Sequence, residues 1–192
     1  TNQHHKLQLK LFFDGKPMGI TDEVDVPDLD QKSHTKCKHP GLIRSTPRVF
    51  YTFVGQHLDG LGTRGLMGHH GYRMKHMLAK MRGNNSNRAL EIQFSQQTLV
   101  YGIIQQPSHE DDDELMVTEF AITLPSTEDK DKWFPMEKDG QTKIYTFKRT
   151  WKRGILFARF SPPVQTSVLR IYPQQWHGLP YFRLAFLGCT LL

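Results

Sequence analysis

Residues 160–189 read FSPPVQTSVLRIYPQQWHGLPYFRLAFLGC and contain two β-strand patterns on either side of a loop. The first pattern, residues 168–172, is rich in β-branched and aromatic side chains, and Pro173 is expected to end it because proline cannot donate to a strand ladder. In the second, residues 182–186, large apolar side chains alternate with Arg or Ala, as in a strand with one buried face. Loops on rigid β scaffolds often carry recognition residues, so the loop at 174–180 is a candidate binding segment.

Short strand patterns of the same kind recur upstream, from residue 37 onward. We expect strands at residues 48–54, 90–94, 99–104, 120–124, 143–147 and 155–160. Residues 99–104 are nearly all apolar, as expected of a strand buried on both faces. Short strands at this spacing predict an all-β sandwich or barrel. The exception is a predicted amphipathic helix over residues 73–82, whose methionine-rich face we expect to pack on the core.

The first 36 residues differ from the rest and are interpreted as an N-terminal extension. Alternating leucines followed by the turn sequence at residues 14–17 predict a strand and a hairpin. Residues 21–30 are acidic and contain a proline, so we expect an extended linker there. The chain is therefore divided into an extension, residues 1–36, and one domain, residues 37–192.

Composition narrows the classes of protein and of partner. The chain has 192 residues, 38% hydrophobic content and a net charge of +6, and its mean hydropathy is −0.53. No apolar run approaches the roughly 20 residues that a membrane-spanning helix needs. The basic charge favours acidic partners such as sulfated glycans, anionic lipid headgroups or nucleic acid. No Gly-x-Ser-x-Gly, phosphate-binding loop or zinc-protease motif is present, so we expect no enzyme activity.

Several segments of the chain resemble the discoidin family, also called coagulation factor 5/8 type C domains, over about residues 37–189. The resemblance rests on the ending quoted above, on residues 89–94 followed by 98–106, on 116–122 and on 132–135, which occur in the order typical of that family. Ala89 stands where the family commonly has tryptophan. The resemblance implies a jellyroll β-sandwich of the galactose-binding-like class, whose loops at one end bind a ligand.

The resemblance also implies an extracellular protein with one disulfide between Cys37 and Cys189. Closing a loop of about 150 residues removes roughly 5 kcal/mol of denatured-state entropy in the chain-entropy model. Two free, buried cysteines in a reducing compartment are the alternative. Asn84 begins an Asn-Asn-Ser glycosylation sequon in a segment with turn composition, which agrees with secretion.

Three loops are expected to converge at the binding end: residues 55–72, 107–115 and 174–180. Their candidate ligand-binding residues are His57, Leu61, Arg64, Leu66, Met67, His69, His70, Tyr72, Arg73, Asp112, Glu114, Trp176 and His177. The apolar side chains of the first loop either project for contact or fold back onto the barrel rim. Trp176 either contacts ligand or closes the end of the barrel.

Charged and histidine-rich segments add further candidates. Calcium or a basic partner would suit the five carboxylates between Glu110 and Glu114, although a solvated acidic loop is the simpler interpretation. The histidines of the first loop lack the spacing of common zinc sites, so no metal is predicted. Residues 148–153 (KRTWKR) are the densest basic run and suit sulfate, phosphate or nucleic acid, or form a solvated turn.

These observations predict a non-catalytic adhesion module, secreted or part of an ectodomain. Its expected ligand is a cell-surface glycan, a glycoprotein or a matrix component. One alternative is peripheral binding to anionic phospholipid through Leu61, Leu66 and Met67, with Arg64 and Arg73 at the headgroups. Another is an architectural subunit that pairs with a neighbouring chain through residues 1–36.

The disulfide is directly testable. We expect non-reducing peptide mapping to recover Cys37 and Cys189 in one linked peptide pair. Alkylation of both thiols in the native, unreduced protein would contradict the disulfide and the extracellular assignment that depends on it.

Overall fold

The computed structural model describes residues 5–7, 10–13, 16–20, 24–26, 41–43, 47–53, 56–67, 71–73, 88–110, 113–129, 131–149 and 154–191. Its strands are β1 (His5–Leu7), β2 (Lys10–Phe13), β3 (Lys16–Ile20), β4 (Val24–Val26), β5 (Gly41–Leu42), β6 (Arg48–Phe53), β7 (Gln56–Gly62), β8 (Tyr72–Arg73), β9 (Arg88–Gln105), β10 (Ser108–Glu110), β11 (Asp113–Pro125), β12 (Trp133–Pro135), β13 (Glu137–Lys138), β14 (Gln141–Thr142), β15 (Tyr145–Thr146), β16 (Lys148–Arg149), β17 (Leu156–His177), β18 (Tyr181–Phe182) and β19 (Leu184–Thr190). The all-β prediction is confirmed for these residues. Among them, no helix long and apolar enough to cross a membrane occurs.

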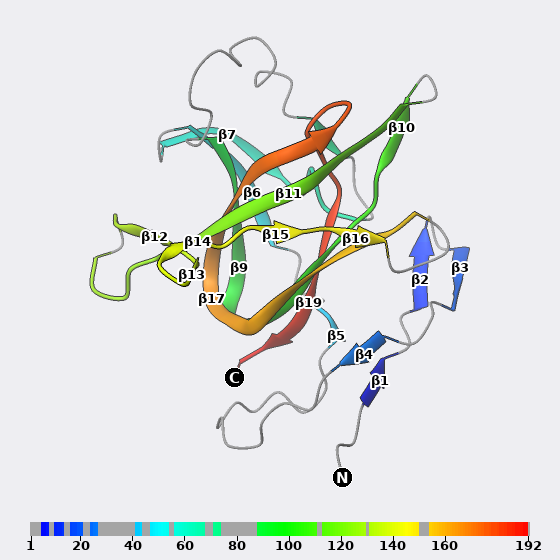
Figure 1. Cartoon of the computed structure of the whole chain (residues 1–192). Helices are drawn as coiled ribbons and strands as arrows, with labels where there is room; N and C mark the ends of the chain where they lie inside the picture. The colour runs from blue at the N-terminus through cyan, green and yellow to red at the C-terminus, as the bar shows by residue number, and fades with distance from the viewer. Residues whose placement is uncertain are drawn as a thin grey trace.

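One antiparallel sheet contains most of the strands, in the order β10-β11-β17-β9-β19-β5. Four more strands join this path: β6 pairs with β9 and β7, β12 and β15 pair with β11, and β16 pairs with β17. The two long strands curve around the core in Figure 1, so each belongs to both sides of the fold. The first part of β9 lies between β6 and the later part of β17. The second part of β9 lies between β19 and the first part of β17.

The sequence predicts separate strands where the structure has two continuous ones. The expected strands at 90–94 and 99–104 are both parts of β9, and those at 155–160 and 168–172 are both parts of β17. Pro173 does not end its strand, as expected from the sequence, but pairs with Phe120 beside register shifts in β11. Proline is tolerated at such bulges because the local ladder hydrogen bonds are already interrupted.

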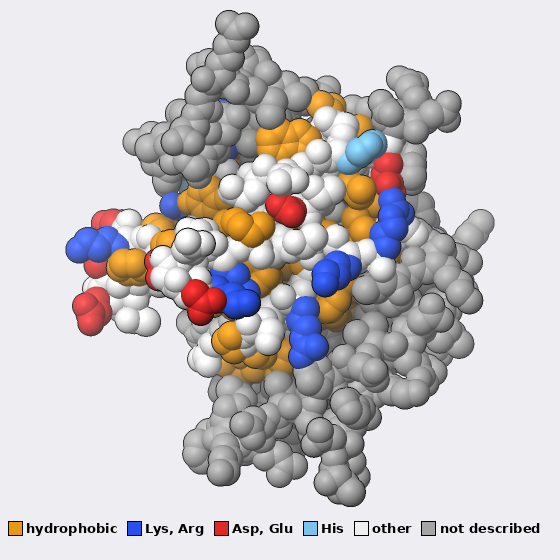
Figure 2. All heavy atoms as spheres, in the orientation of Figure 1, with side chains coloured by type: hydrophobic (Ala, Val, Ile, Leu, Met, Phe, Trp, Pro, Cys, Tyr) orange, Lys and Arg blue, Asp and Glu red, His pale blue; other side chains and the backbone are white. Residues whose placement is uncertain are grey.

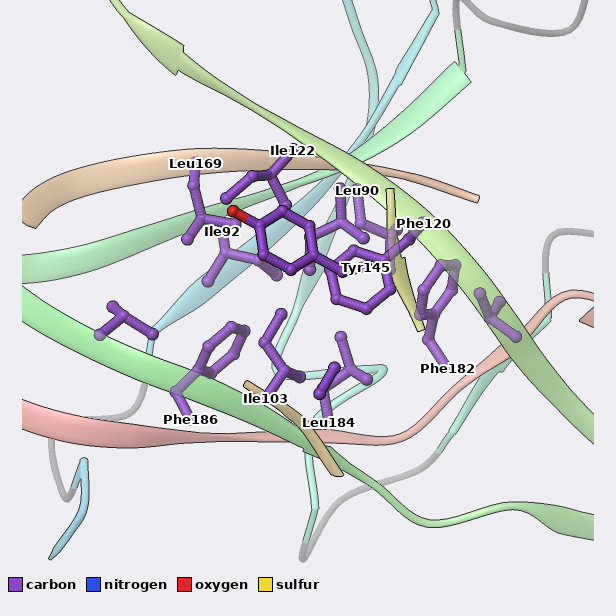
Figure 3. Packing of buried hydrophobic residues seen from close by; sticks show 14 of the residues in the cluster. Leu90, Ile92, Ile103, Phe120, Ile122, Tyr145, Leu169, Phe182, Leu184 and Phe186 are labelled. Carbon is purple, nitrogen blue, oxygen red and sulfur yellow. The ribbon is translucent and has the colours of Figure 1, made fainter. Parts of the chain in front are cut away.

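The main core fills the space that the curved sheet encloses. Figure 3 shows side chains from β9, β11, β17 and β19 meeting there, with Tyr145 and Phe182 among them. Phe182, Leu184 and Phe186 are all buried, which confirms the alternation predicted for the last strand. The Phe120 ring packs against Phe147 at 4.9 Å between centroids. Burial of these large apolar side chains is the main source of stability.

A second apolar cluster lies on the other side of β9 and β19 and contains Leu99, Tyr101, Ile104, Ile155 and Leu187. Val100 and Ile103 instead join the main core. Residues 99–104 are therefore buried on both faces, as predicted. The ladder between β9 and β19 shifts register at Gly188, where an added Cβ would lie 2.0 Å from the carbonyl oxygen of Leu99. Only glycine allows this close approach of the two strands.

Part of the segment predicted as a loop, residues 55–72, is a strand. Gln56–Gly62 forms β7 and pairs with β6, and this ladder has two register shifts, one between Gly62 and Gly60 and one between Asp59 and His57. The glycines are tolerated there because a bulge disrupts regular pairing. The turn that follows is held to β19: Met67 donates its N–H to the carbonyl of Leu184, and Leu184 donates to that of Gly65.

In the N-terminal extension, the predicted hairpin is confirmed as β2 paired with β3. The predicted linker over 21–30 is wrong for Val24–Val26, which pairs with β1. Alternating valines give this short segment strand character despite its acidic surroundings. These four strands form two-stranded sheets separate from the large sheet, as far as the described residues show.

Other predictions fall outside the described residues. They include the helix over 73–82, except Arg73, and also Cys37 and the sequon at Asn84. The disulfide and the glycosylation therefore stay predictions.

Burial of Leu66 predicts the outcome of a substitution in the first loop. The side chain is 4% exposed and belongs to the main core. We expect Leu66→Ser to lower the free energy of unfolding by about 3–5 kcal/mol, because it leaves a cavity and buries a hydroxyl. Arg64→Ser, in the exposed part of the same turn, should change it by about 0.5 kcal/mol or less. Equal melting temperatures for both variants, measured by calorimetry, would contradict the burial of Leu66.

Candidate functional site

A short two-stranded pair joins the first and third predicted binding segments, and the second adjoins the third. β8, at the end of the first segment, pairs with β18, which follows the third segment. The second segment is a hairpin rather than the expected acidic loop, because β10 pairs with β11 through Glu110 and Asp113. It adjoins the third segment, since a Cβ added to Gly178 would lie 2.6 Å from Leu115 Cδ2. In Figure 1 these elements gather at the end of the fold opposite the C-terminus.

His177, Glu114 and Arg149 form a connected polar group at this junction, which we call the HER cluster. The Nδ1 atom of His177 lies 2.7 Å from the backbone carbonyl oxygen of Glu114. The Glu114 carboxylate accepts a hydrogen bond from Nη2 of Arg149. Figure 2 shows a histidine, an acidic and a basic side chain following one another at the right edge of the described surface. His177 and Arg149 are exposed and Glu114 is half-buried.

The carbonyl contact determines the tautomer of His177. A carbonyl oxygen can only accept, so Nδ1 carries the proton and donates it. In the neutral ring Nε2 is then an acceptor. Arg149 has further N–H groups besides the one donated to Glu114. The HER cluster therefore offers an acceptor, a carboxylate and a donor fork within one short segment of surface.

Two aromatic residues predicted to bind ligand lie at the rim of the core. Trp176 and Tyr72 are each half-buried and pack against the main core. The Tyr72 ring lies 6.2 Å from that of Tyr51 between centroids. Trp176 thus packs on the core and keeps an exposed portion, and its contact with a ligand stays a prediction.

The remaining predicted residues do not form one group. Leu61 and Leu66 are buried in the main core, so of the two alternatives for these side chains the structure supports folding back rather than projection. The turn hydrogen bonds hold this segment against β19. Met67 is half-buried against the second cluster. Arg64 is exposed, and Arg73 is described only by its backbone in β8. His69, His70 and Asp112 lie outside the described residues.

His57 belongs to a different group, centred on a buried ion pair. Glu91 and Arg170 lie opposite each other in the β9–β17 ladder, with Nε of Arg170 2.9 Å from Oε2 of Glu91. Oε1 of Glu91 accepts hydrogen bonds from His57 Nε2 and Gln93 Nε2, both at 2.8 Å. The His57 side chain is 42% exposed and its ring stacks on Phe50 at 4.5 Å.

Trp133 covers the cation of this group. The Arg170 guanidinium carbon lies 3.7 Å from the Trp133 ring centroid. Every polar group of the ion pair that the structure describes is hydrogen-bonded or stacked, which is the arrangement that makes a buried charge tolerable. The group around Glu91 therefore has a structural role. His57 takes part in it by hydrogen bonding to Glu91, so we do not assign His57 to ligand binding.

The surroundings of Glu91 alter its acidity. Burial alone would raise the pKa of its carboxyl, but the hydrogen bonds from Gln93, Arg170 and His57 together outweigh burial and lower the pKa below 4.5. The folded state therefore favours the carboxylate more than the unfolded chain does. The resulting stabilisation is complete above the unfolded pKa and is lost as pH falls through the lower, folded value.

A metal site is not seen in the part of the chain that the structure describes. There, no group of three or more His, Cys, Asp or Glu side chains could hold a metal ion. Of the acidic run considered for calcium, Glu114 is paired with Arg149, and Asp111 and Asp112 lie outside the described residues.

Sequence reasoning selected His177 and Glu114 but did not assign Arg149 to the site. Arg149 belongs to the basic run at 148–153, which the sequence indicated separately as a candidate site for sulfate, phosphate or nucleic acid. Its link to Glu114 was hidden because the two residues are far apart in sequence. Glu91 and Arg170 gave no sequence signal, because each is a single charged residue in a strand pattern.

Comparison with solved structures shows what the fold is similar to. The CBM32-1 and CBM32-2 domains of Clostridium perfringens ZmpB match with a TM-score of 0.50 and 10% identity, over 79% of this chain and 40% of theirs. The same domains in complex with GalNAc match with a TM-score of 0.48 and 11% identity, over 79% and 39%. Recombinant discoidin II of Dictyostelium discoideum matches with a TM-score of 0.43 and 15% identity, over 57% and 40%.

The chain thus matches about two fifths of the length of these structures. No protein-family model matches it, and no curated protein sequence does. At such low identity the likeness to the CBM32 domains concerns the fold, which agrees with the jellyroll expected from the sequence.

Removing the Glu91 carboxylate should destabilise the fold in a pH-dependent way. We expect Glu91→Gln to lower the free energy of unfolding at pH 7 by about 3 kcal/mol, because Arg170 keeps a buried charge without its counter-ion. The difference from wild type should shrink below pH 4.5, where the wild-type carboxylate loses its advantage. Denaturant unfolding at several pH values measures both effects.

The double variant Glu91→Gln/Arg170→Met is the control for this experiment. It removes both charges and should recover part of the stability lost in Glu91→Gln. A difference between Glu91→Gln and wild type that stays constant down to pH 3 would contradict the proposed cause.

Proposed function

We propose that this chain, which has a discoidin-like jellyroll fold, is a non-catalytic module that binds a glycan through the HER cluster and the surface around it. The observation that carries the proposal is the convergence of the three segments at β8 and β18, with His177, Glu114 and Arg149 joined beside them. The likeness of the fold to the CBM32 domains suits a carbohydrate ligand.

The chemistry of the cluster fits a sugar. Neighbouring sugar hydroxyls each donate one hydrogen bond and accept others, so they are best held by a mixture of acceptors and donors. Nε2 of His177 and the Glu114 carboxylate accept, and the Arg149 guanidinium donates. The exposed portion of Trp176 offers an apolar surface for the C–H face of a sugar ring.

The proposal also includes an extracellular location for the protein. A glycan on a cell surface or in the extracellular matrix is met outside the cell, where the predicted Cys37–Cys189 disulfide would persist. A glycoprotein or matrix component that carries such a glycan is the corresponding partner. The membrane alternative is not favoured, because Leu61 and Leu66, the side chains expected to enter lipid, are buried.

Substitutions in the HER cluster test the proposal. We expect His177→Ala and Glu114→Gln each to weaken binding to immobilised galactose- or GalNAc-containing glycans by about tenfold or more, because each removes one hydrogen bond to the ligand. Both variants should unfold within about 1 kcal/mol of wild type, since His177 is exposed and the side-chain amide oxygen in Glu114→Gln can still accept from the exposed Arg149.

A glycan array measures binding and calorimetry measures stability. Gln165→Ala is the matched control, because Gln165 is an exposed residue of the same strand, β17, at a position paired with Leu99. Unchanged glycan binding in both cluster variants, with the fold intact, would remove the HER cluster from the binding site.

A further inference from the structure

The charges of this chain are distributed unevenly along the sequence. Residues 140–192 contain eight Lys and Arg residues and no Asp or Glu. All acidic residues lie in the part that precedes Gly140, so the whole net charge of +6 has its source in the C-terminal part. A surface made mainly by β15, β16 and β17 must therefore receive its counter-charges from other elements or remain basic.

Several of these cations have partners within the fold. Arg170 is paired with Glu91, and Arg149 is paired with Glu114. Lys143 donates from its ammonium to the carbonyl of Ser161 and lies 5.0 Å from the Tyr145 ring centroid. Neither the carbonyl nor the ring neutralises the positive charge of Lys143, and among the described residues no acid forms an ion pair with it.

Lys148 and Arg159 extend this charge along the surface. Lys148 lies opposite Phe157 in the β16–β17 ladder, so Arg159, two residues further along β17, is its diagonal neighbour on the same face. Such diagonal residues have Cβ atoms roughly 7 Å apart. Both side chains are exposed, and Figure 2 shows Lys and Arg side chains over β16 and the first part of β17.

We propose that Lys143, Lys148 and Arg159, here called the basic strip, form a subsite for the sulfate groups of an anionic glycan. The inference rests on the proposed function and specifies its ligand class. Sulfate oxygens accept charge-assisted hydrogen bonds from ammonium and guanidinium groups, the strongest polar contacts that these side chains make. The strip presents such donors on paired strands, which hold the spacing between the two exposed cations.

Arg149 connects the strip to the HER cluster. It follows Lys148 directly in β16 and donates to Glu114, whose carbonyl accepts from His177. Consecutive strand residues point to opposite faces, so a ligand whose sugar hydroxyls contact the HER cluster must extend across β16 to place its sulfate groups on the strip. Two acids of β11 border this surface: Glu114, already paired, and the half-buried Glu119, which lies opposite Thr146 of β15.

A sulfated polysaccharide is favoured over single-stranded nucleic acid for this surface. Proteins that bind single strands interleave their cations with exposed aromatic rings on which the bases stack. The aromatic residues between Lys143 and Lys148 are Tyr145 and Phe147, and both are buried. Phe157, which lies opposite Lys148, is half-buried and packs against the second apolar cluster, so the described strip offers only part of one ring for stacking.

Heparin is the probe for the test, with chemically desulfated heparin as its control. We expect the full chain to bind immobilised heparin in low salt, to bind desulfated heparin at least about tenfold more weakly, and to lose affinity steeply as salt is raised. The double variant Lys148→Gln/Arg159→Gln should weaken heparin binding about tenfold or more, because it removes two charge-assisted contacts.

The matched control removes the same charge elsewhere. Lys132→Gln/Lys138→Gln changes two exposed lysines beside β12 and in β13, and it should leave heparin binding within about twofold of wild type. An equal loss in both double variants would mean that net charge alone attracts heparin, and it would overturn the assigned subsite. Stronger binding to a single-stranded oligonucleotide or to phosphatidylserine vesicles than to heparin would also overturn it.

Separate binding measurements with neutral and with sulfated glycans distinguish the two proposals. Lys148→Gln/Arg159→Gln should keep the binding of neutral galactose- or GalNAc-containing glycans, whereas His177→Ala should lose it. Neutral binding without any preference for sulfated chains overturns the subsite and leaves the proposed function standing. Binding to neither neutral nor sulfated glycans overturns the proposed function.

Discussion

The antiparallel ladder between β9 and β17 is the constraint on which the rest of this structure depends. β9 pairs on its other edge with β6 and then with β19, while β17 pairs with β11 and with β16. Because both strands curve, one continuous ladder connects the strands on both sides of the core. The Glu91–Arg170 ion pair bridges this ladder, and its buried charges tolerate no shift of register, since a slip by one residue would separate them.

The candidate site is a consequence of the same ladder. β17 begins beside β16, which presents Lys148 and Arg149, and ends at His177 beside β11, which presents Glu114. The two ends of one strand thus bring Arg149 and His177 to the same residue, Glu114. Curvature of β17 around the core makes this possible, as Figure 1 shows. The site is built on paired strands, so its polar groups keep their relative positions better than they would on free loops.

Burial explains where the sequence-based predictions succeeded and where they were wrong. Alternation in residues 182–186 and the apolar run at 99–104 report directly on which faces are buried, and both predictions are confirmed. The glycines of residues 55–71 predicted a loop, whereas Gly60 and Gly62 lie in β7, a strand with bulges. Leu61 and Leu66 looked like exposed contacts because local sequence does not show that backbone hydrogen bonds to β19 fold this turn inward. His177 and Glu114 were predicted by residue type, but Arg149 required a pairing across 35 positions.

The sequence by itself determined the all-β class, the positions of most of the long strands and the excess of positive charge near the C-terminus. These properties depend on local composition and on a period of two residues, which can be read without knowing what lies opposite each strand. Only the tertiary structure decided that four predicted strands are two, that Pro173 lies inside a strand, and that His57 contacts Glu91. These features depend on register between distant strands, and register is set by the burial of whole faces in the folded chain.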